Sequence, residues 1–287
     1  MTSSHAERIK FVERSPSAVA AQDRTAWLAL FADFSVIEDP VGSAPHINGL
    51  YDKRSQRRGN DAAARFYDTF IADNPIQFHR GRDFVCGNSV MRDLSLQPSG
   101  FSEPIPMHLL YQLCEEGGEL KILRLAAHWS PREALQSQRR RTDSATGKSG
   151  SLSRLLHQQG LTGAVGWLRG LSTVGKIGIA RAQEFFNHFN RAEASACEAL
   201  FGSQSLGVAW PANSPWKDCG EHAGRGIKIK AEKWIAAGSA VSCSITIERG
   251  NTSYPAVAVF ELNRRSHEIH SLRYYCKNEQ AGKLLDS

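Results

Sequence analysis

Two adjacent carboxylates, Glu38 and Asp39, follow the apolar run "ALFADFSVI" and precede Pro40 and Gly42. Neighbouring side chains of an extended segment point to opposite faces, so one acid can face an interior while the other faces solvent. The proline and glycine turn would hold that acid at the rim of an apolar interior. A carboxylate in such a place can act as a general base. One of these two acids is therefore expected at the rim of an apolar interior, and the other at the surface.

Histidines supply further candidates for proton transfer or hydrogen bonding. His108 lies in the strand-like stretch "IPMHLLYQL", where it shares a face with Leu110 and opposes Tyr111. We take His108 as a catalytic candidate, with a purely structural role as its alternative. His46, in the loop after the acid, and His128, at the end of the last strand, are two others.

The elements that must position these groups read as helices first and strands after. Apolar spacing predicts helices over residues 18–34 and 60–75, and strand-like stretches follow between residue 76 and residue 129. The predicted class is α+β, a curved and mostly antiparallel sheet wrapped around helices as a cone (a cystatin-like α+β roll). The residues expected to contact a ligand inside it are Trp27, Phe31, Phe66, Tyr67, Phe70, Tyr111 and His128.

A weak internal repeat indicates two tandem cones. The segment "LALFADFSVIEDP" at 28–40 is similar to "EALFGSQSLGVAWP" at 198–211, and "GELKILRLAAHW" at 118–129 is similar to "HEIHSLRYYCK" at 267–277. Aligning Leu30 with Leu200 and Leu123 with Leu272 makes the second copy about twenty positions shorter. Ala209 or Trp210 stands where the first copy has its acid, so we predict that the second copy is non-catalytic.

The predicted domains are residues 1–131, a connecting segment 132–178, and the degenerate second copy 179–287. The connection begins with a polar, basic linker that has too few apolar residues to order itself. It continues as a glycine-rich amphipathic stretch up to residue 178. Either it packs on a neighbouring domain or it makes a peripheral membrane contact through 152–178.

Composition excludes several classes of protein. The six cysteines form no C-x-x-C pair, which argues against a zinc site and a disulfide framework and indicates reduced thiols in a cytoplasmic protein. We expect no metal and no other cofactor. The net charge of +6 comes without aromatic residues interleaved among the basic ones, so we expect no nucleic-acid partner.

The segment "ALFADFSVIEDPVGSAPHING" resembles the part of bacterial ketosteroid isomerases that carries their catalytic aspartate, within the nuclear-transport-factor-2-like and SnoaL-like superfamily. The resemblance covers most of residues 18–130. It implies that Asp39 moves a proton between C4 and C6 of a 3-keto-Δ5 steroid. It also implies a tyrosine and a protonated aspartic acid as oxyanion donors. Their places fall near Ser15 and Leu110, where this chain has neither residue.

Three functions follow from this resemblance. The first is a proton-transfer enzyme that acts on a hydrophobic steroid-like ketone. The alternatives are a non-catalytic module that binds a steroid or lipid, and a SnoaL-like cyclase that acts on a polyketide. In each case the partner is a hydrophobic small molecule. Because proteins of this superfamily commonly pair, the two copies are expected to pair within one chain or the chain is expected to form a homodimer.

Overall fold

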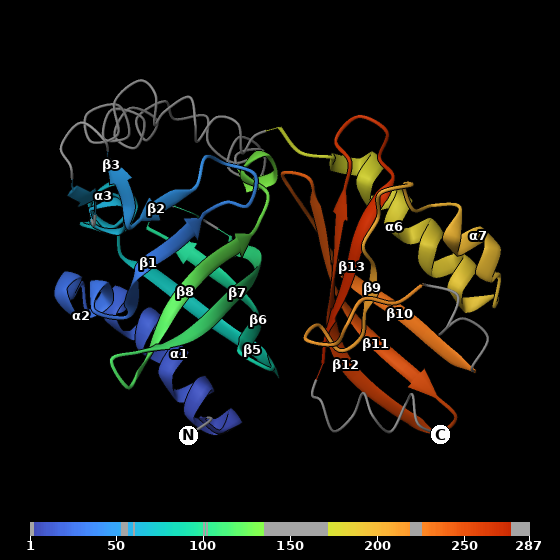
Figure 1. The fold of residues 1–287 in the computed structure, drawn as a ribbon, viewed down its shortest axis with the longest axis horizontal. Helices are drawn as coiled ribbons and strands as arrows, with labels where there is room; N and C mark the ends of the chain where they lie inside the picture. The colour runs from blue at the N-terminus through green and yellow to red at the C-terminus, as the bar shows by residue number, and fades with distance from the viewer. Residues whose placement is uncertain are drawn as a thin grey trace.

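The computed structural model describes residues 3–52, 57–59, 61–99, 101, 103–134, 172–218 and 226–276, which form two α+β units (Figure 1). The first unit contains α1 (His5–Ala20), α2 (Arg24–Leu28), β1 (Phe31–Glu38), β2 (His46–Asn48), β3 (Leu50–Asp52), β4 (Arg57–Gly59), α3 (Ala62–Phe70), β5 (Ile76–Cys86), β6 (Ser89–Pro98), β7 (Ile105–Glu116) and β8 (Glu119–His128). The second contains α6 (Gly175–Asn190), α7 (Ala194–Glu198), β9 (Gly207–Ala209), β10 (Ile227–Ala237), β11 (Ala240–Arg249), β12 (Thr252–Leu262) and β13 (Ile269–Tyr275). Residues 135–171, which include most of the predicted connection and of the proposed membrane contact, lie outside the described residues.

The two sheets share the order of five strands, to which the first adds β2, and this confirms the predicted α+β class with two tandem cones. The first has the order β2-β1-β8-β7-β6-β5 and the second β10-β11-β12-β13-β9. All neighbours are antiparallel except β1 with β8 and β13 with β9, which join the beginning and end of each unit. Shifts in register at Arg80 to Arg82 and at Ala231 to Lys233 bend the long strands at matching places.

The first helices differ from the prediction. A helix over 18–34 is wrong, because α1 ends at Ala20, α2 at Leu28, and Phe31 already begins β1. α1 begins earlier because the Ser4 hydroxyl accepts from the Glu7 backbone N–H and the Glu7 carboxylate accepts from that of Ser4, a capping box. The second predicted helix is present as α3.

The repeat is real, but its register in the last strand differs from the prediction. The Leu30 carbonyl accepts from Ile122 and that of Leu200 accepts from Ile269, so these pairs are equivalent. Leu272 therefore corresponds to Leu125, two positions beyond the predicted Leu123. After the first strand, Val41 N–H donates to Ala127 and Ala212 N–H donates to Tyr274, which makes Trp210 the equivalent of Asp39.

Each sheet has an inner face, covered by its own helices, and an outer face, turned toward the other unit (Figure 1). The inner faces hold the two main cores. The outer faces together form a third apolar cluster with members from both units. These members are Val41, Phe84, Cys86, Met91, Leu110 and Ala126 from the first unit, and Ala212, Ala237, Ala240, Val257, Val259 and Tyr275 from the second. Burying apolar area on both sheets stabilises their contact.

A polar network crosses this contact. Lys233 of the second unit donates to Asp93 Oδ1 at 2.7 Å and to the carbonyls of Leu94 at 2.7 Å and Met107 at 3.0 Å. Ser244 donates to Asp93 Oδ2 at 2.8 Å. All three protons of the Lys233 ammonium thus have acceptors on the first unit, as a group removed from water requires.

The closest backbone approach between the units involves two glycines. Gly42, in the turn after Asp39, and Gly238 have φ angles of 92° and 57°. A Cβ atom on Gly42 would lie 2.3 Å from the Gly238 Cα, so no larger residue fits at the contact. The glycine of the "EDPVG" motif therefore serves the docking of the two units as well as the turn.

Replacing Lys233 by methionine should weaken the contact between the units, because it removes the ammonium that donates to Asp93 Oδ1 and to two carbonyls and leaves the Asp93 carboxylate, among the described residues, only its hydrogen bond from Ser244. We expect the free energy of unfolding to fall by about 2–3 kcal/mol. Lys230→Met, an exposed position on the same strand paired with Glu248, should change it by less than about 1 kcal/mol. Urea unfolding followed by tryptophan fluorescence measures both; equal effects would contradict a special role for Lys233.

Candidate active site

Asp39 and Trp129 meet at one edge of the first sheet. Asp39 directly follows β1 and Trp129 directly follows β8. These two strands are parallel neighbours, and Glu38 of β1 is paired with Ala126 of β8. Parallel strands end at the same edge, so residues some 90 positions apart in sequence come together there. The Trp129 indole Nε1 donates to Asp39 Oδ1 at 2.6 Å. Asp39 shares its face with Ile37, a member of the inner core.

The surroundings of Asp39 raise its pKa to about 6, because burial disfavours the charged form more than the hydrogen bond from Trp129 favours it. Among the described residues, no cation pairs with this carboxylate and its second oxygen accepts no hydrogen bond. The side chain is nevertheless half-buried rather than enclosed. Such an acid is ionised at neutral pH and basic enough to take a proton from a bound molecule.

Glu38 points the other way, as the alternation of an extended segment predicts. Its carboxylate accepts from Arg124 Nε at 2.6 Å. It is half-buried in this ion pair rather than fully exposed, because the second unit lies on that side. Because Glu38 is held by Arg124 on the outer side, Asp39 is the one of these two acids that lies on the inner face.

The structure corrects the placing of His108 and His128. Both lie on the outer face, opposite one another on β7 and β8, whereas Tyr111 faces the inner core. His108 is fully buried against the second unit, with Nδ1 2.8 Å from Ser242 Oγ and Nε2 2.9 Å from Ser244 Oγ. Burial lowers the pKa of His108 well below its usual value and that of His128 to about 3. Strand alternation therefore separates both from Asp39.

Most of the aromatic residues expected to touch a ligand pack against one another. Trp27, Phe31, Phe66, Tyr67 and Tyr111 are at most 7% exposed and belong to one inner cluster. Side chains that lined a water-sized cavity would retain more accessible surface, so these rings form the floor of the site. Phe70, also predicted, is half-buried beside them.

His46 lies on the same face as Asp39. It is paired with Ile37 across β1 and β2, and its ring centroid is 5.2 Å from that of Phe66 and 6.3 Å from that of Phe70. Burial, and secondly the nearby Arg65, lower its pKa to about 4, so the imidazole is neutral at pH 7. The sequence offered His46 only as a loop residue, and it gave no sign of Trp129 beyond an aromatic residue after the last strand.

The two places where the resemblance implies oxyanion donors are now defined. Ser15, on α1, accepts from Trp27 Nε1 at 3.2 Å and hydrogen-bonds the hydroxyl of Tyr111. Leu110 faces the second unit, so its neighbour Tyr111 is the inward-pointing residue of that part of β7. A serine and a tyrosine therefore meet inside the core: Ser15 stands where the resemblance places the tyrosine, and Tyr111 is one position beyond Leu110, where it places the aspartic acid.

The second unit has no acid at the equivalent place. Trp210 replaces Asp39, and its ring lies 4.4 Å from that of Tyr274, which replaces Ala127. Both are at most 3% exposed, so in the second unit two large side chains fill the volume that corresponds to the surroundings of Asp39 in the first. This arrangement favours packing over chemistry.

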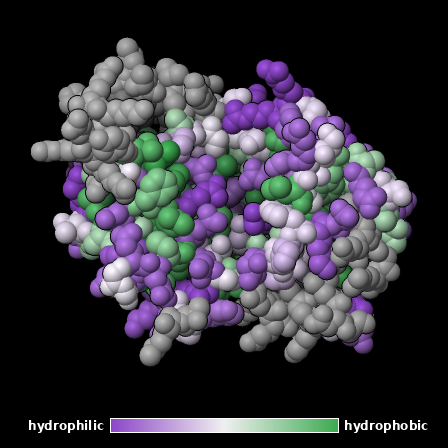
Figure 2. All heavy atoms as spheres, in the orientation of Figure 1, coloured by the Kyte–Doolittle hydropathy of each residue, from purple (hydrophilic) through white to green (hydrophobic). Residues whose placement is uncertain are grey.

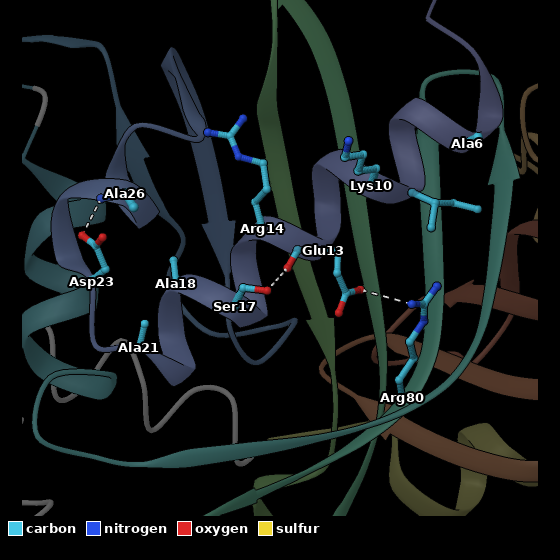
Figure 3. Close-up of a pocket in the computed structure, with 11 residues that line it drawn as sticks. Ala6, Lys10, Glu13, Arg14, Ser17, Ala18, Ala21, Asp23, Ala26 and Arg80 are labelled. Carbon is cyan, nitrogen blue, oxygen red and sulfur yellow. Dashed lines mark hydrogen bonds and ion pairs between the residues drawn. The ribbon is translucent and has the colours of Figure 1, made fainter.

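A separate groove of about 750 Å³ runs along α1 (Figure 3). It is lined by Ala6, Ile9, Lys10, Glu13, Arg14, Ser17, Ala18, Ala21, Asp23, Ala26 and Arg80, none of them a predicted site residue. Arg80 at its end forms an ion pair with Glu13 at 3.5 Å. Two apolar side chains of the first unit are exposed elsewhere, Phe34 of β1 and Leu50 of β3, which are 49% and 54% accessible. Figure 2 shows hydrophobic residues on the surface of both units.

Within the described ranges, no three His, Cys, Asp or Glu side chains are placed to hold a metal ion. The five cysteines of the described residues are free thiols. In the same part of the chain, no helix combines the length and the apolar character needed to cross a membrane.

The chain is similar to solved structures, but it matches no family model and no curated protein sequence. Similar solved structures include a Δ5-3-ketosteroid isomerase from Mycobacterium sp. (26% identity, 42% of this chain and 92% of that one, TM-score 0.34). Others are a Mycobacterium tuberculosis protein in complex with estradiol-17beta-hemisuccinate (27%, 43% and 94%, 0.34) and a putative polyketide cyclase from Sinorhizobium meliloti (18%, 41% and 93%, 0.32).

Each of these structures matches a share of this chain close to that of one unit. The strand order and packing by themselves define the architecture as a tandem pair of α+β cones.

Trp129→Phe should raise the pKa of Asp39 further, because it removes the one hydrogen bond that favours the charged carboxylate. The carboxyl ¹³C shift of Asp39, followed with pH, measures this. Trp216→Phe, which changes an indole of the second unit, serves as the control and should leave the titration where it is. An unchanged pKa in Trp129→Phe would contradict the contact.

Asp39→Asn should stabilise the protein at high pH. The folded-state pKa of about 6 lies above the usual 3.8. Ionising the buried group therefore costs free energy, and this cost grows as the pH rises from 3.8 to about 6 and is fully present above that. The variant should gain on the order of 2 kcal/mol over wild type at pH 8 and nothing below about pH 4. Urea midpoints at both pH values test this, and a gain that is equal at the two would contradict the raised pKa.

Proposed function

We propose that the first unit catalyses proton transfer on a hydrophobic, enolisable carbonyl compound, with Asp39 as the general base. The observation that carries this proposal is the state of that carboxylate. It is half-buried at the rim of an apolar interior, its pKa is raised to about 6, and a neutral indole rather than a cation holds it. A structural acid in a folded protein is usually paired with a cation or fully hydrogen-bonded.

The reaction needs a base that takes a proton from carbon and returns it to another carbon. Asp39 would remove the proton beside the carbonyl, and the electrons of that C–H bond would form a C=C bond while the carbonyl oxygen becomes an enolate. Returning the proton at a conjugated carbon completes a double-bond shift. The "EDPVGS" segment favours a 3-keto-Δ5 steroid as the substrate, and the same step on a polyketide would suit a SnoaL-like cyclase.

The second unit would support this site without chemistry of its own. Its outer face covers that of the first unit, and Trp210 and Tyr274 fill the place of the acid. We infer that this pairing within one chain takes the place of a homodimer. Residues 1–131 and 179–287 would then be the two domains, and a cytoplasmic location stays a prediction.

A non-catalytic binding module is the second candidate. Ser15 and Leu110 stand at the places of the two oxyanion donors, and losing one such donor costs about 10²–10³ in rate. A protein that binds steroids or lipids without turnover would keep the apolar rim and the acid. Binding of a steroid that undergoes no reaction would favour this candidate.

Asp39→Asn should abolish turnover while keeping ligand affinity, because the amide is nearly isosteric and cannot accept the proton. The measurement is growth of the conjugated-enone ultraviolet band after a 3-keto-Δ5 steroid is added. For wild type, kcat/KM should rise through pH 6 as Asp39 ionises.

Glu38→Gln is the matched control, since it neutralises the adjacent acid on the opposite face and should retain turnover. Activity that survives in Asp39→Asn would show that another group is the base. If neither wild type nor variant reacts while both bind the steroid, the binding module is the better description.

A further inference from the structure

We propose that His46 is the second catalytic residue of this site, a neutral imidazole that donates a hydrogen bond to the carbonyl oxygen of the substrate as Asp39 removes the adjacent proton. This inference rests on the proposed function, which requires some donor to stabilise the enolate oxygen. It also limits the substrate to compounds whose reacting carbonyl lies close to the abstracted proton.

The strand register brings the two groups to one face. His46 lies opposite Ile37 across β1 and β2, and Asp39 is two residues beyond Ile37. Asp39 lies one residue beyond the end of β1 and two beyond the last pair of this ladder, on the same face as His46. In a regular ladder, diagonal neighbours have Cα atoms about 7–8 Å apart. A flat carbonyl fragment fits between two side chains at that separation, with its C–H toward one and its oxygen toward the other.

Both groups have hydrogen-bonding capacity that the described residues do not use. Among the described residues neither ring nitrogen of His46 has a hydrogen-bond partner, and Asp39 uses only Oδ1. Both are half-buried, so a ligand can reach them. Edge-on contacts with Phe66 and Phe70 hold the imidazole plane, which reduces the freedom lost when it binds a ligand.

The protonation states suit these roles. Burial and Arg65 keep His46 neutral, so its N–H donates without surrendering a proton, and burial makes Asp39 a stronger base. In the step, the C–H proton goes to Asp39, the C–H electron pair forms the C=C bond, and the carbonyl π pair becomes the enolate lone pair that His46 stabilises. No proton leaves His46 and no further reactant is needed.

The depth of the site favours a small reacting fragment over one that is buried deeply. Trp27, Tyr67 and Tyr111 close the interior below it at 1–2% exposure. The Tyr111 hydroxyl forms a hydrogen bond with the Ser15 side chain within that core. A donor at the rim, next to the base, therefore contacts the substrate more readily than one at the far end.

The first experiment compares His46→Phe, which keeps a ring against Phe66 and Phe70 but has no N–H, with His46→Gln, which retains an N–H donor. In the enone assay, we expect kcat of His46→Phe to fall by about 10²–10³ and that of His46→Gln to lie between it and wild type. The rise of activity near pH 6 should persist in both. His79→Phe, at an exposed histidine, is the control. If His46→Phe matches wild type while Asp39→Asn is inactive, the inference fails and the proposed function stands.

A second readout needs no turnover, so it separates failure of this inference from failure of the proposed function. The probe is 2-naphthol, whose ionised form resembles an enolate, titrated by fluorescence into Asp39→Asn and into Asp39→Asn/His46→Phe. Loss of the imidazole donor should weaken binding of the naphtholate by about ten- to a hundredfold. Equal affinities would overturn the inference whatever the enone assay shows. A further test leaves His46 unchanged and follows its N–H resonance in Asp39→Asn. If this resonance does not shift when naphtholate binds, the inference is also overturned.

Discussion

The parallel pairing of β1 with β8 is the constraint on which the site depends. Every other strand pair of the first sheet is antiparallel and joins neighbours in sequence, so this pair alone brings the beginning of the unit to its end. Because parallel strands finish at the same edge, Asp39 and Trp129 leave the sheet together. The hydrogen bond from Val41 to Ala127 continues the pairing past the acid and fixes where the chain turns. The position of one carboxylate is thus set by the closure of the whole unit.

The second constraint is that both faces of the central strands are buried. Inner residues such as Tyr111 meet the helices, and outer residues such as Leu110 meet the second unit. An apolar contact between two sheets does not by itself select one register. The bonds from Lys233 to Asp93 and to two backbone carbonyls can form in one alignment only, and the Gly42 and Gly238 contact permits no closer or bulkier one. The polar network therefore specifies the docking that the apolar residues drive.

What the sequence predicted well was local. The acid, its turn and the repeat depend on short segments whose meaning does not require a partner, and all three are present in the structure. The helix over 18–34 failed because the apolar spacing of "LALFADF" suits a helix and a buried strand equally, and only pairing with β8 selects the strand. His108 was misplaced because its own strand does not reveal that the outer face is covered by Ser242 and Ser244. Trp129 was missed because its partner is 90 positions away, and His46 acquires its face only when β2 pairs with β1.

The two units share a strand order, but only the first has an acid at the position of Asp39. Comparing them shows what a buried carboxylate requires. At the Asp39 position the first unit keeps a charge that burial destabilises, and it leaves Ala127 small beside it. The second unit places Trp210 against Tyr274 there, which gains apolar burial and ring contact in the same volume. One half thus holds the proposed base, whose charge burial destabilises, while the other contributes packing across the shared outer faces. A single acid is sufficient for the proposed chemistry, so the second copy does not need a buried carboxylate. Its contact between Trp210 and Tyr274 stabilises the chain and offsets part of the free energy that burying Asp39 costs.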